Sequence, residues 1–133
     1  MKTTNKILLI DDEPDILEFL SYNFRKKNFT VITAKNGLEG LKQADLELPQ
    51  VIISDILMPE MNGIEMSMEL RKNKELNKTP IIFLTAAFNS YSFLDAKSSA
   101  ADQYVAKPIK FENLLKIVNQ VMNINQNFTR CSL

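Results

Sequence analysis

Residues 7–12 read Ile-Leu-Leu-Ile-Asp-Asp, four apolar residues followed directly by two acids, and this stretch decides the fold. A run that is apolar at every position is typical of a strand buried on both faces, because a half-exposed strand alternates apolar and polar residues. Beyond the acids, Ile16, Leu20 and Phe24 recur at helical spacing. The stretch therefore predicts a buried strand that leads into a helix, with acidic groups at the junction.

The same alternation recurs along the chain. Further apolar runs occur at 31–33, 51–53, 81–84 and 104–105, and helical spacing predicts helices near 14–27, 38–47, 63–73, 90–99 and 111–123. Strands that alternate with helices form a parallel sheet covered by helices on both faces. We therefore predict one α/β domain over residues 1–123, a doubly wound five-stranded parallel sheet, followed by a polar C-terminal tail over 124–133 that frays.

The residue after each apolar run indicates where a ligand binds, because ligands of open parallel sheets bind beyond the carboxyl ends of the strands. The runs are followed by Asp11 and Asp12, by Asp55, by Thr85 and by Lys107, whereas the run at 31–33 is followed by no acid. That strand is therefore predicted at the edge of the sheet, far from the site. The flavodoxin-like strand order 2-1-3-4-5 satisfies this requirement.

Composition excludes several kinds of chemistry. The 133 residues include no histidine and one cysteine, so neither a histidine-dependent nucleophile nor a Cys/His zinc site can form. Sixteen basic residues balance sixteen acidic ones, which argues against direct binding of nucleic acid. The longest apolar runs are too short for a membrane helix and the first ten residues do not read as a signal peptide, so we expect a cytoplasmic protein without membrane contact.

Three neighbouring carboxylates, Asp11, Asp12 and Asp55, repel one another and raise each other's pKa unless a cation is present. Mg²⁺ fits best, because it takes one or two protein carboxylates, keeps several waters and accepts phosphate oxygens. The site then has room for a phosphoryl group, which Asp55 can capture as an aspartyl phosphate. Lys107 would neutralise the charge of that group and Thr85 would donate a hydrogen bond to it.

Each residue also has a simpler explanation when it is taken alone. Asp11 and Asp12 can cap the first helix, Asp55 can cap a loop, Thr85 can cap the next helix, and Lys107 can be a solvated lysine. These explanations fail jointly, because they do not account for every such residue falling at the same end of its strand.

Together these residues resemble the response-regulator receiver domains of two-component signalling, over about residues 6–123. The likeness is carried by Asp11-Asp12, by Asp55-Ile56-Leu57-Met58-Pro59 with Gly63, by Leu84-Thr85-Ala86 and by Tyr104-Val105-Ala106-Lys107-Pro108. Two departures leave the chemistry untouched: Ala100-Ala101 stands where the family commonly has Gly-Ala, and Ile109 stands where it often has phenylalanine.

The resemblance implies how phosphate and metal are held. Asp55 would be the phosphoacceptor, and Asp12, Asp55 and the backbone carbonyl of Leu57 would hold Mg²⁺. Asp11 would help through a water molecule. Lys107 would contact the phosphoryl group, and the resemblance also implies a cis peptide bond between this lysine and the following proline.

The resemblance further implies a switch. Thr85 would contact the phosphoryl group, and Tyr104 would turn inward when Thr85 moves. This change would reshape the surface formed by the predicted helix 90–99, the strand 104–105 and the helix 111–123, which a downstream protein partner would read.

The donor must be another protein, because this chain has no histidine. A sensor histidine kinase or a histidine phosphotransfer protein would supply the phosphoryl group. Leu57 and Ala87 are apolar at positions whose side chains can reach the attacking water, so we expect slow self-dephosphorylation. Beyond that and self-phosphorylation from small donors, we expect no enzymatic activity.

Four alternatives remain at this point. A flavin-binding domain would need a Ser-, Thr- and Gly-rich loop after the first strand, where Asp11-Asp12-Glu13 stands instead. An aspartate-nucleophile phosphohydrolase would need Asp-x-Asp there. A degenerate receiver would act only as a binding module, although no acidic, hydroxyl or lysine position is missing. The chain can also be a receiver excised from a larger regulator or a hybrid kinase.

Overall fold

The computed structural model describes residues 5–86 and 102–131. Five strands form one sheet, β1 (Asn5–Ile10), β2 (Phe29–Ala34), β3 (Val51–Asp55), β4 (Ile81–Ala86) and β5 (Gln103–Lys107). The described helices are α1 (Pro14–Lys26), α2 (Gly37–Glu47), α3 (Gly63–Leu70) and α5 (Phe111–Cys131). The predicted helix at 90–99 and Ala87 lie outside the described residues.

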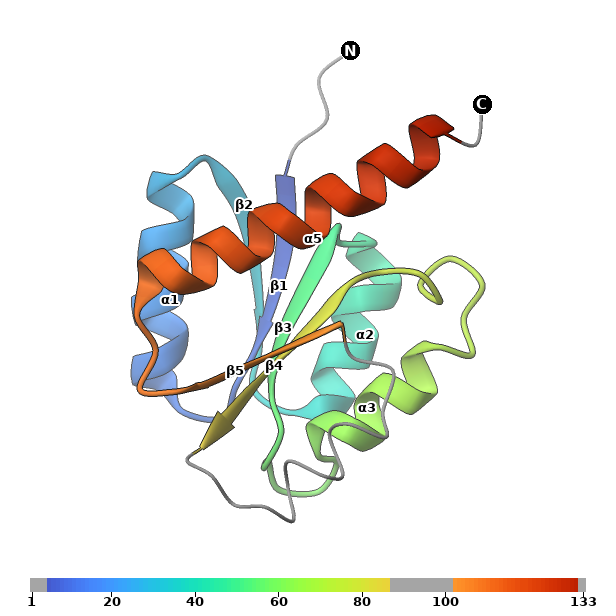
Figure 1. Ribbon diagram of the computed structural model, residues 1–133. Coiled ribbons are helices and arrows are strands. Elements are labelled where there is room, and N and C mark those ends of the chain that lie inside the picture. Colours follow the sequence, from blue (N-terminus) through green and yellow to red (C-terminus); the bar gives the residue numbers. More distant parts are fainter. Residues whose placement is uncertain (1–4, 87–101, 132–133) are drawn as a thin grey trace.

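The sheet is parallel throughout, with strand order β2-β1-β3-β4-β5. This confirms the predicted fold class and strand order, including the edge position of β2. Helices α1 and α5 cover one face of the sheet, and α2 and α3 cover the other (Figure 1). The register pairs Ile10 with Ser54 and Asp55 with Leu84, so the ends of β1, β3 and β4 lie level with one another.

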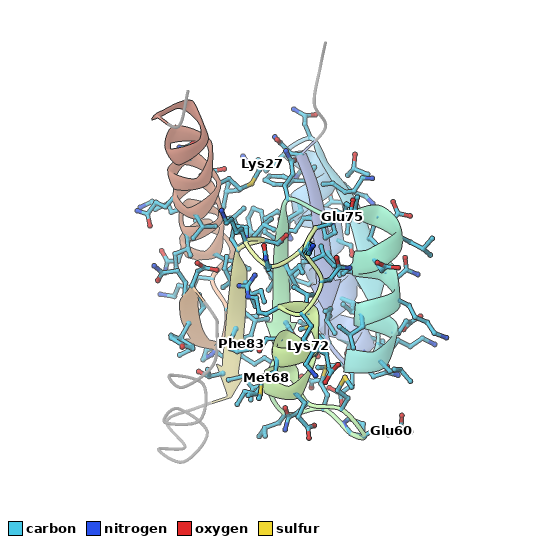
Figure 2. The ribbon with its side chains drawn as sticks, turned by 90° about the vertical axis from the view of Figure 1, so that its right-hand side faces the viewer. Lys27, Glu60, Met68, Lys72, Glu75 and Phe83 are labelled. Carbon is cyan, nitrogen blue, oxygen red and sulfur yellow. The ribbon has the colours of Figure 1, made fainter. Side chains whose placement is uncertain are left out.

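Two hydrophobic cores explain why the strands are apolar at every position. Along β1, Ile7 and Leu9 pack in the core beneath α1 and α5, while Leu8 and Ile10 pack in the core beneath α2 and α3. Successive residues of a strand point to opposite faces of the sheet, and helices cover both faces. All four side chains are therefore buried. Side chains fill the space between the sheet and both helical layers, and Phe83 of β4 lies among them (Figure 2).

The starts of the helices follow local capping chemistry. Asn36 accepts a hydrogen bond from the backbone N–H of Glu39 at 2.8 Å and begins α2. Asn62 and Glu65 form a reciprocal capping box at the start of α3. Glu13 occupies the N-cap position of α1, but its side chain makes no capping hydrogen bond. The Glu13 carboxylate is therefore available for another contact.

Two helix ends differ from prediction. Helix α5 continues to Cys131, so the predicted end of this helix near 123 is wrong. No proline or glycine occurs between Phe111 and Cys131, and the weak helix propensity of asparagine alone does not end a helix. Helix α3 ends early, at Leu70, where Arg71 donates hydrogen bonds to the carbonyls of Leu76 and Thr79 in the following turns.

Among residues 5–86 and 102–131, no helix is long and apolar enough to cross a membrane.

Candidate functional site

Three carboxylates meet at the carboxyl edge of the sheet. Asp11 and Asp12 follow β1, and Asp55 ends the adjacent strand β3. One carboxylate oxygen from each residue lies within 4.8 Å of the other two. Asp11 and Asp55 are buried, with 1% and 6% of their surfaces exposed, whereas Asp12 faces solvent. The predicted acidic cluster therefore forms, with two buried carboxylates and one that is exposed to solvent.

Lys107 supplies the positive charge at this edge. Its Nζ lies 3.6 Å from Oδ2 of Asp55 and 3.5 Å from Oδ2 of Asp11, and its side chain is only 16% exposed. Burial lowers the pKa of Lys107, but the attraction of Asp55, Asp11 and Glu13 outweighs burial and raises the pKa above its ordinary value. The lysine therefore stays charged at neutral pH. The peptide bond to Pro108 is cis, as the resemblance implied.

The two buried acids are held at an electrostatic cost. Burial, reinforced by the charge of Asp11, raises the pKa of Asp55 to about 6, even though Lys107 acts in the opposite direction. Burial also raises the pKa of Asp11, while the Glu13 backbone N–H that donates to its Oδ1 at 2.9 Å lowers it. One lysine does not balance this cluster, so further positive charge would be stabilised there.

The backbone around Asp55 is fixed by close packing. The N–H of Ile56 donates to Oδ1 of Asp55 at 2.9 Å, and the N–H of Gly63 donates to the carbonyl of Ile56 at 2.8 Å. A Cβ atom at Gly63 would collide with the carbonyl oxygen of Asp55 and press on the Phe83 ring. The absence of a side chain at Gly63 thus allows the start of α3 to lie against the end of β3.

The remaining predicted residues lie on the neighbouring strands or at the rim of the site. Thr85 is half-buried on β4, one residue beyond Leu84, which pairs with Asp55. Tyr104 on β5 is half-buried, with its ring centroid 6.3 Å from that of Phe83. Leu57, just after β3, is 56% exposed.

Sequence reasoning missed one member of the site. The carboxylate Oε1 of Glu13 lies 3.3 Å from Nζ of Lys107, a shorter distance than that from the lysine to either aspartate. Glu13 is 61% exposed, so it joins the cluster from the solvent side. The only signal in the sequence was its place directly after Asp11 and Asp12, where it could equally have been a helix-capping residue.

The donor set fits a hard divalent cation. All three clustered side chains are carboxylates, and burial raises the pKa values of Asp11 and Asp55, with the charge of Asp11 adding to the shift of Asp55. Mg²⁺ prefers such oxygen ligands and usually keeps several waters, which an exposed ligand such as Asp12 permits. The cluster thus combines two buried carboxylates, an exposed one and the ammonium group of Lys107, with oxygen donors that suit a second cation.

Comparisons with known proteins relate the chain to receiver domains. A family model described as response regulator receiver domain matches residues 7–119. Protein PilH of Pseudomonas aeruginosa is 33% identical over 117 residues, 88% of this chain and 97% of PilH. The alkaline phosphatase synthesis transcriptional regulatory protein PhoP of Bacillus subtilis is 39% identical over 103 residues, 77% of this chain but 42% of PhoP. The chain therefore spans less than half of PhoP.

Solved structures show the same fold. The chemotaxis response regulator CheY4 of Vibrio cholerae superimposes with a TM-score of 0.84 at 32% identity, covering 90% of this chain and 99% of CheY4. The receiver domain of a sensor histidine kinase from Pseudomonas aeruginosa, which has a magnesium ion coordinated in its active-site cleft, superimposes with a TM-score of 0.85. That domain is 23% identical, with coverage of 91% of this chain and 99% of that one, so it shows likeness of fold alone.

Proposed function

The chain belongs to the family of response regulator receiver domains, and we propose that Asp55 accepts a phosphoryl group from a phosphohistidine on a partner protein. Domains of this family are signalling modules rather than classical enzymes. The observation that carries the proposal is the cluster itself, in which buried Asp55 lies within 4.8 Å of two further carboxylates and 3.6 Å from Nζ of Lys107. A residue that only capped a helix would need neither the two carboxylates nor the lysine beside it, whereas phosphoryl transfer uses both kinds of group.

In the transfer step, a carboxylate oxygen of Asp55 attacks the phosphorus of the phosphohistidine. The new O–P bond forms as the P–N bond breaks, and the electron pair of that bond stays on the imidazole nitrogen, which takes a proton from solvent. Charge spreads over the phosphoryl oxygens in this loose transition state. Lys107, already 3.6 Å from Asp55, lies close enough to neutralise part of that charge without a large movement.

Asp12, Asp55 and the backbone carbonyl of Leu57 would hold Mg²⁺, with Asp11 acting through a water molecule. The acid cluster supports this assignment, since its three carboxylates offer oxygen ligands only and two of them have raised pKa values. When bound, Mg²⁺ would neutralise charge on the phosphoryl oxygens. Exposed Asp12 leaves an open side through which a donor protein can approach.

Phosphorylation would be read through Thr85 and Tyr104. Thr85 pairs with Ala106 on β5, and Phe83 pairs with Tyr104, so Thr85 and Tyr104 lie diagonally across the two strands, two residues apart in register. A phosphoryl group on Asp55 adds acceptor oxygens, and a shift of Thr85 toward them would free space for the Tyr104 ring. A cytoplasmic protein partner would then bind the altered surface near β5 and α5, while a sensor histidine kinase or a histidine phosphotransfer protein would act as donor.

Incubation with a small phosphodonor, with and without Mg²⁺, followed by intact-mass measurement tests the proposal. We expect a Mg²⁺-dependent gain of one phosphoryl group that is acid-stable and base-labile, and that Asp55→Asn lacks. Asp15→Asn, which removes an exposed aspartate of α1, is the matched control and should be phosphorylated like wild type. Absence of any adduct on folded, metal-supplied wild type would contradict the proposal and favour a degenerate receiver that only binds partners.

A further inference from the structure

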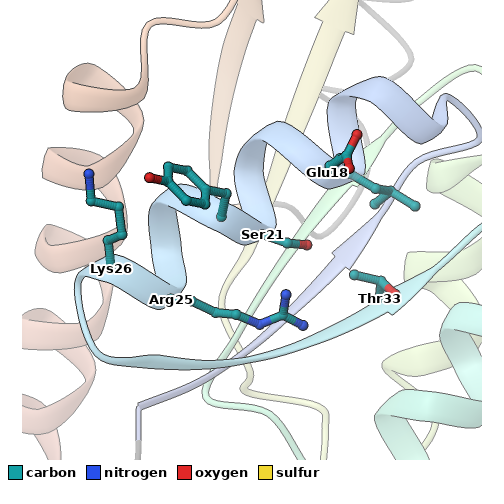
Figure 3. A pocket seen from close by; sticks show the side chains of 7 residues that line it. Glu18, Ser21, Arg25, Lys26 and Thr33 are labelled. Atoms are coloured by element: carbon teal, nitrogen blue, oxygen red, sulfur yellow. The ribbon is translucent and has the colours of Figure 1, made fainter.

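A groove of about 650 Å³ lies between α1 and the edge strand β2, and no residue of the acid cluster lines it. Thr33 of β2 lines it from below, and Leu17, Ser21, Tyr22 and Arg25 are among the α1 residues that line it from above. Figure 3 shows the Arg25 side chain extending along the groove toward Thr33, with Ser21 pointing into the same space. The groove is large enough to receive several side chains of a ligand.

Thr33, the β2 residue in the lining of the groove, belongs to the edge strand of the sheet. In the described part of the chain, β2 pairs with β1 only, so its other side presents unpaired backbone groups. Proteins usually blunt such edges with charged residues, proline or bulges within the strand. Residues 29–34 read Phe-Thr-Val-Ile-Thr-Ala and contain neither charge nor proline, and four of them, at consecutive positions 30–33, are β-branched. The strand is therefore well suited to pair with an added strand.

The charges around the groove favour an acidic occupant. Arg25 and Lys26 line it with a single acid, Glu18, and neither cation forms a salt bridge with any residue that the structure describes. Lys26 lies 5.2 Å from the ring centroid of Tyr22, which is 61% exposed and holds that ammonium at the groove. A carboxylate entering the groove would therefore meet unpaired positive charge.

A second copy of this chain is disfavoured as the occupant. If two β2 strands paired with each other, the added strand, residues 29–34, would carry no acid to meet Arg25 and Lys26. A foreign strand that contains acids would be attracted to both cations.

We propose that an extended, acidic segment of another protein binds here by adding to the sheet as a sixth strand beside β2. Its backbone would pair with the free edge, and alternate side chains would enter the groove. Carboxylates among them would reach Arg25 and Lys26, and apolar ones would pack on Leu17 and Tyr22. This surface is separate from Asp55, so binding does not require phosphorylation.

The test uses the whole chain and a synthetic peptide in which valine alternates with glutamate. We expect binding, measured by fluorescence anisotropy, that weakens as salt is added. In amide NMR spectra, the shifted signals should map to residues 29–34 and to α1, and the β2 amides should gain protection from hydrogen exchange. Asp55→Asn should bind the peptide like wild type, which separates this proposal from that of phosphorylation.

Matched variants and peptides sharpen the test. Arg25→Glu should weaken binding by roughly tenfold, because an attraction becomes a repulsion. Lys78→Glu, an equal charge reversal at an exposed site outside the groove, should not. A peptide N-methylated at alternate residues should lose binding because its backbone donors are blocked. Equal binding of a valine–lysine peptide, shifts confined to other elements, or concentration-dependent self-association through β2 would each overturn the proposal.

Discussion

Nζ of Lys107 lies between Asp55 and Asp11, 3.6 Å from one carboxylate and 3.5 Å from the other, although the lysine follows the acids by more than fifty residues in the chain. Parallel strands bring these groups together, because β1, β3 and β5 all end at the same edge of the sheet. The arrangement places the single positive charge of Lys107 beside two buried carboxylates, so negative charge is in excess at the site.

Without divalent metal, Asp55 should make the protein less stable as pH rises. Its pKa is raised from 3.8 to about 6 on folding, so the folded protein keeps a proton that the unfolded chain has lost between these pH values. The free energy of unfolding should fall through this range and stay lower above it. Asp55→Asn should therefore be more stable than wild type at pH 7 in a chelator, by up to about 3 kcal/mol.

Denaturant unfolding at pH 4 and pH 7 measures this effect, with Asp15→Asn as the control that should follow wild type. Some pH dependence should persist in Asp55→Asn, because burial also raises the pKa of Asp11. Added Mg²⁺ should stabilise wild type more than Asp55→Asn, since binding to the folded state adds stability. A wild type that is more stable than Asp55→Asn at pH 7 without metal would show that the buried charge is already compensated.

Removal of the lysine charge should destabilise the site. Lys107→Met leaves Asp11 and Asp55 buried without their shared cation, so we expect a loss of about 1–3 kcal/mol at pH 7 without metal. The loss should shrink at pH 4, where Asp55 is largely protonated and the raised pKa of Asp11 favours its neutral form. Unfolding of Lys116→Met, which removes an exposed lysine of α5, provides the comparison. An equal loss at both pH values would indicate that packing of the lysine stem, rather than its charge, is responsible.

A side chain at Gly63 should disturb Asp55 through its backbone. Gly63→Ala places a Cβ against the carbonyl oxygen of Asp55 and the Phe83 ring, so either α3 or the end of β3 must shift. We expect destabilisation of about 1–3 kcal/mol and slower phosphorylation by a small donor. Met68→Ala truncates a side chain on α3 that is 59% exposed and should change neither quantity appreciably. Unchanged stability and unchanged phosphorylation of Gly63→Ala would contradict the packing argument.

The exposed side chain of Leu57 should influence how long the phosphoryl group persists. Leu57 is apolar and cannot orient a water molecule for attack on an acyl phosphate, so wild type should lose its phosphate slowly. Leu57→Asn offers a polar group at the same place and should accelerate phosphate release, by roughly tenfold if it positions the water. A phosphate-release assay on preloaded protein measures the rate, and faster release from wild type than from Leu57→Asn would refute this expectation.

Much of the fold was predictable because strand burial leaves a direct trace in the sequence. The run 7–10 is apolar at every position, and its side chains divide between two cores as a doubly covered sheet requires. Helix ends were less predictable. The end of α3 depends on Arg71 bonding to carbonyls of a later turn, and α5 continues past a polar segment because nothing in that segment breaks a helix.

The sequence by itself determined which polar groups meet. In a parallel sheet every strand ends at the same edge, so the residues after the apolar runs, from Asp11 to Lys107, had to gather there. Only the tertiary structure decided how they interact: that Glu13 also contacts Lys107, that Asp11 and Asp55 are buried while Asp12 is not, and that the pKa of Asp55 rises to about 6. Distances between charges and exclusion of water depend on how separate segments pack, and no local pattern of residues contains that information.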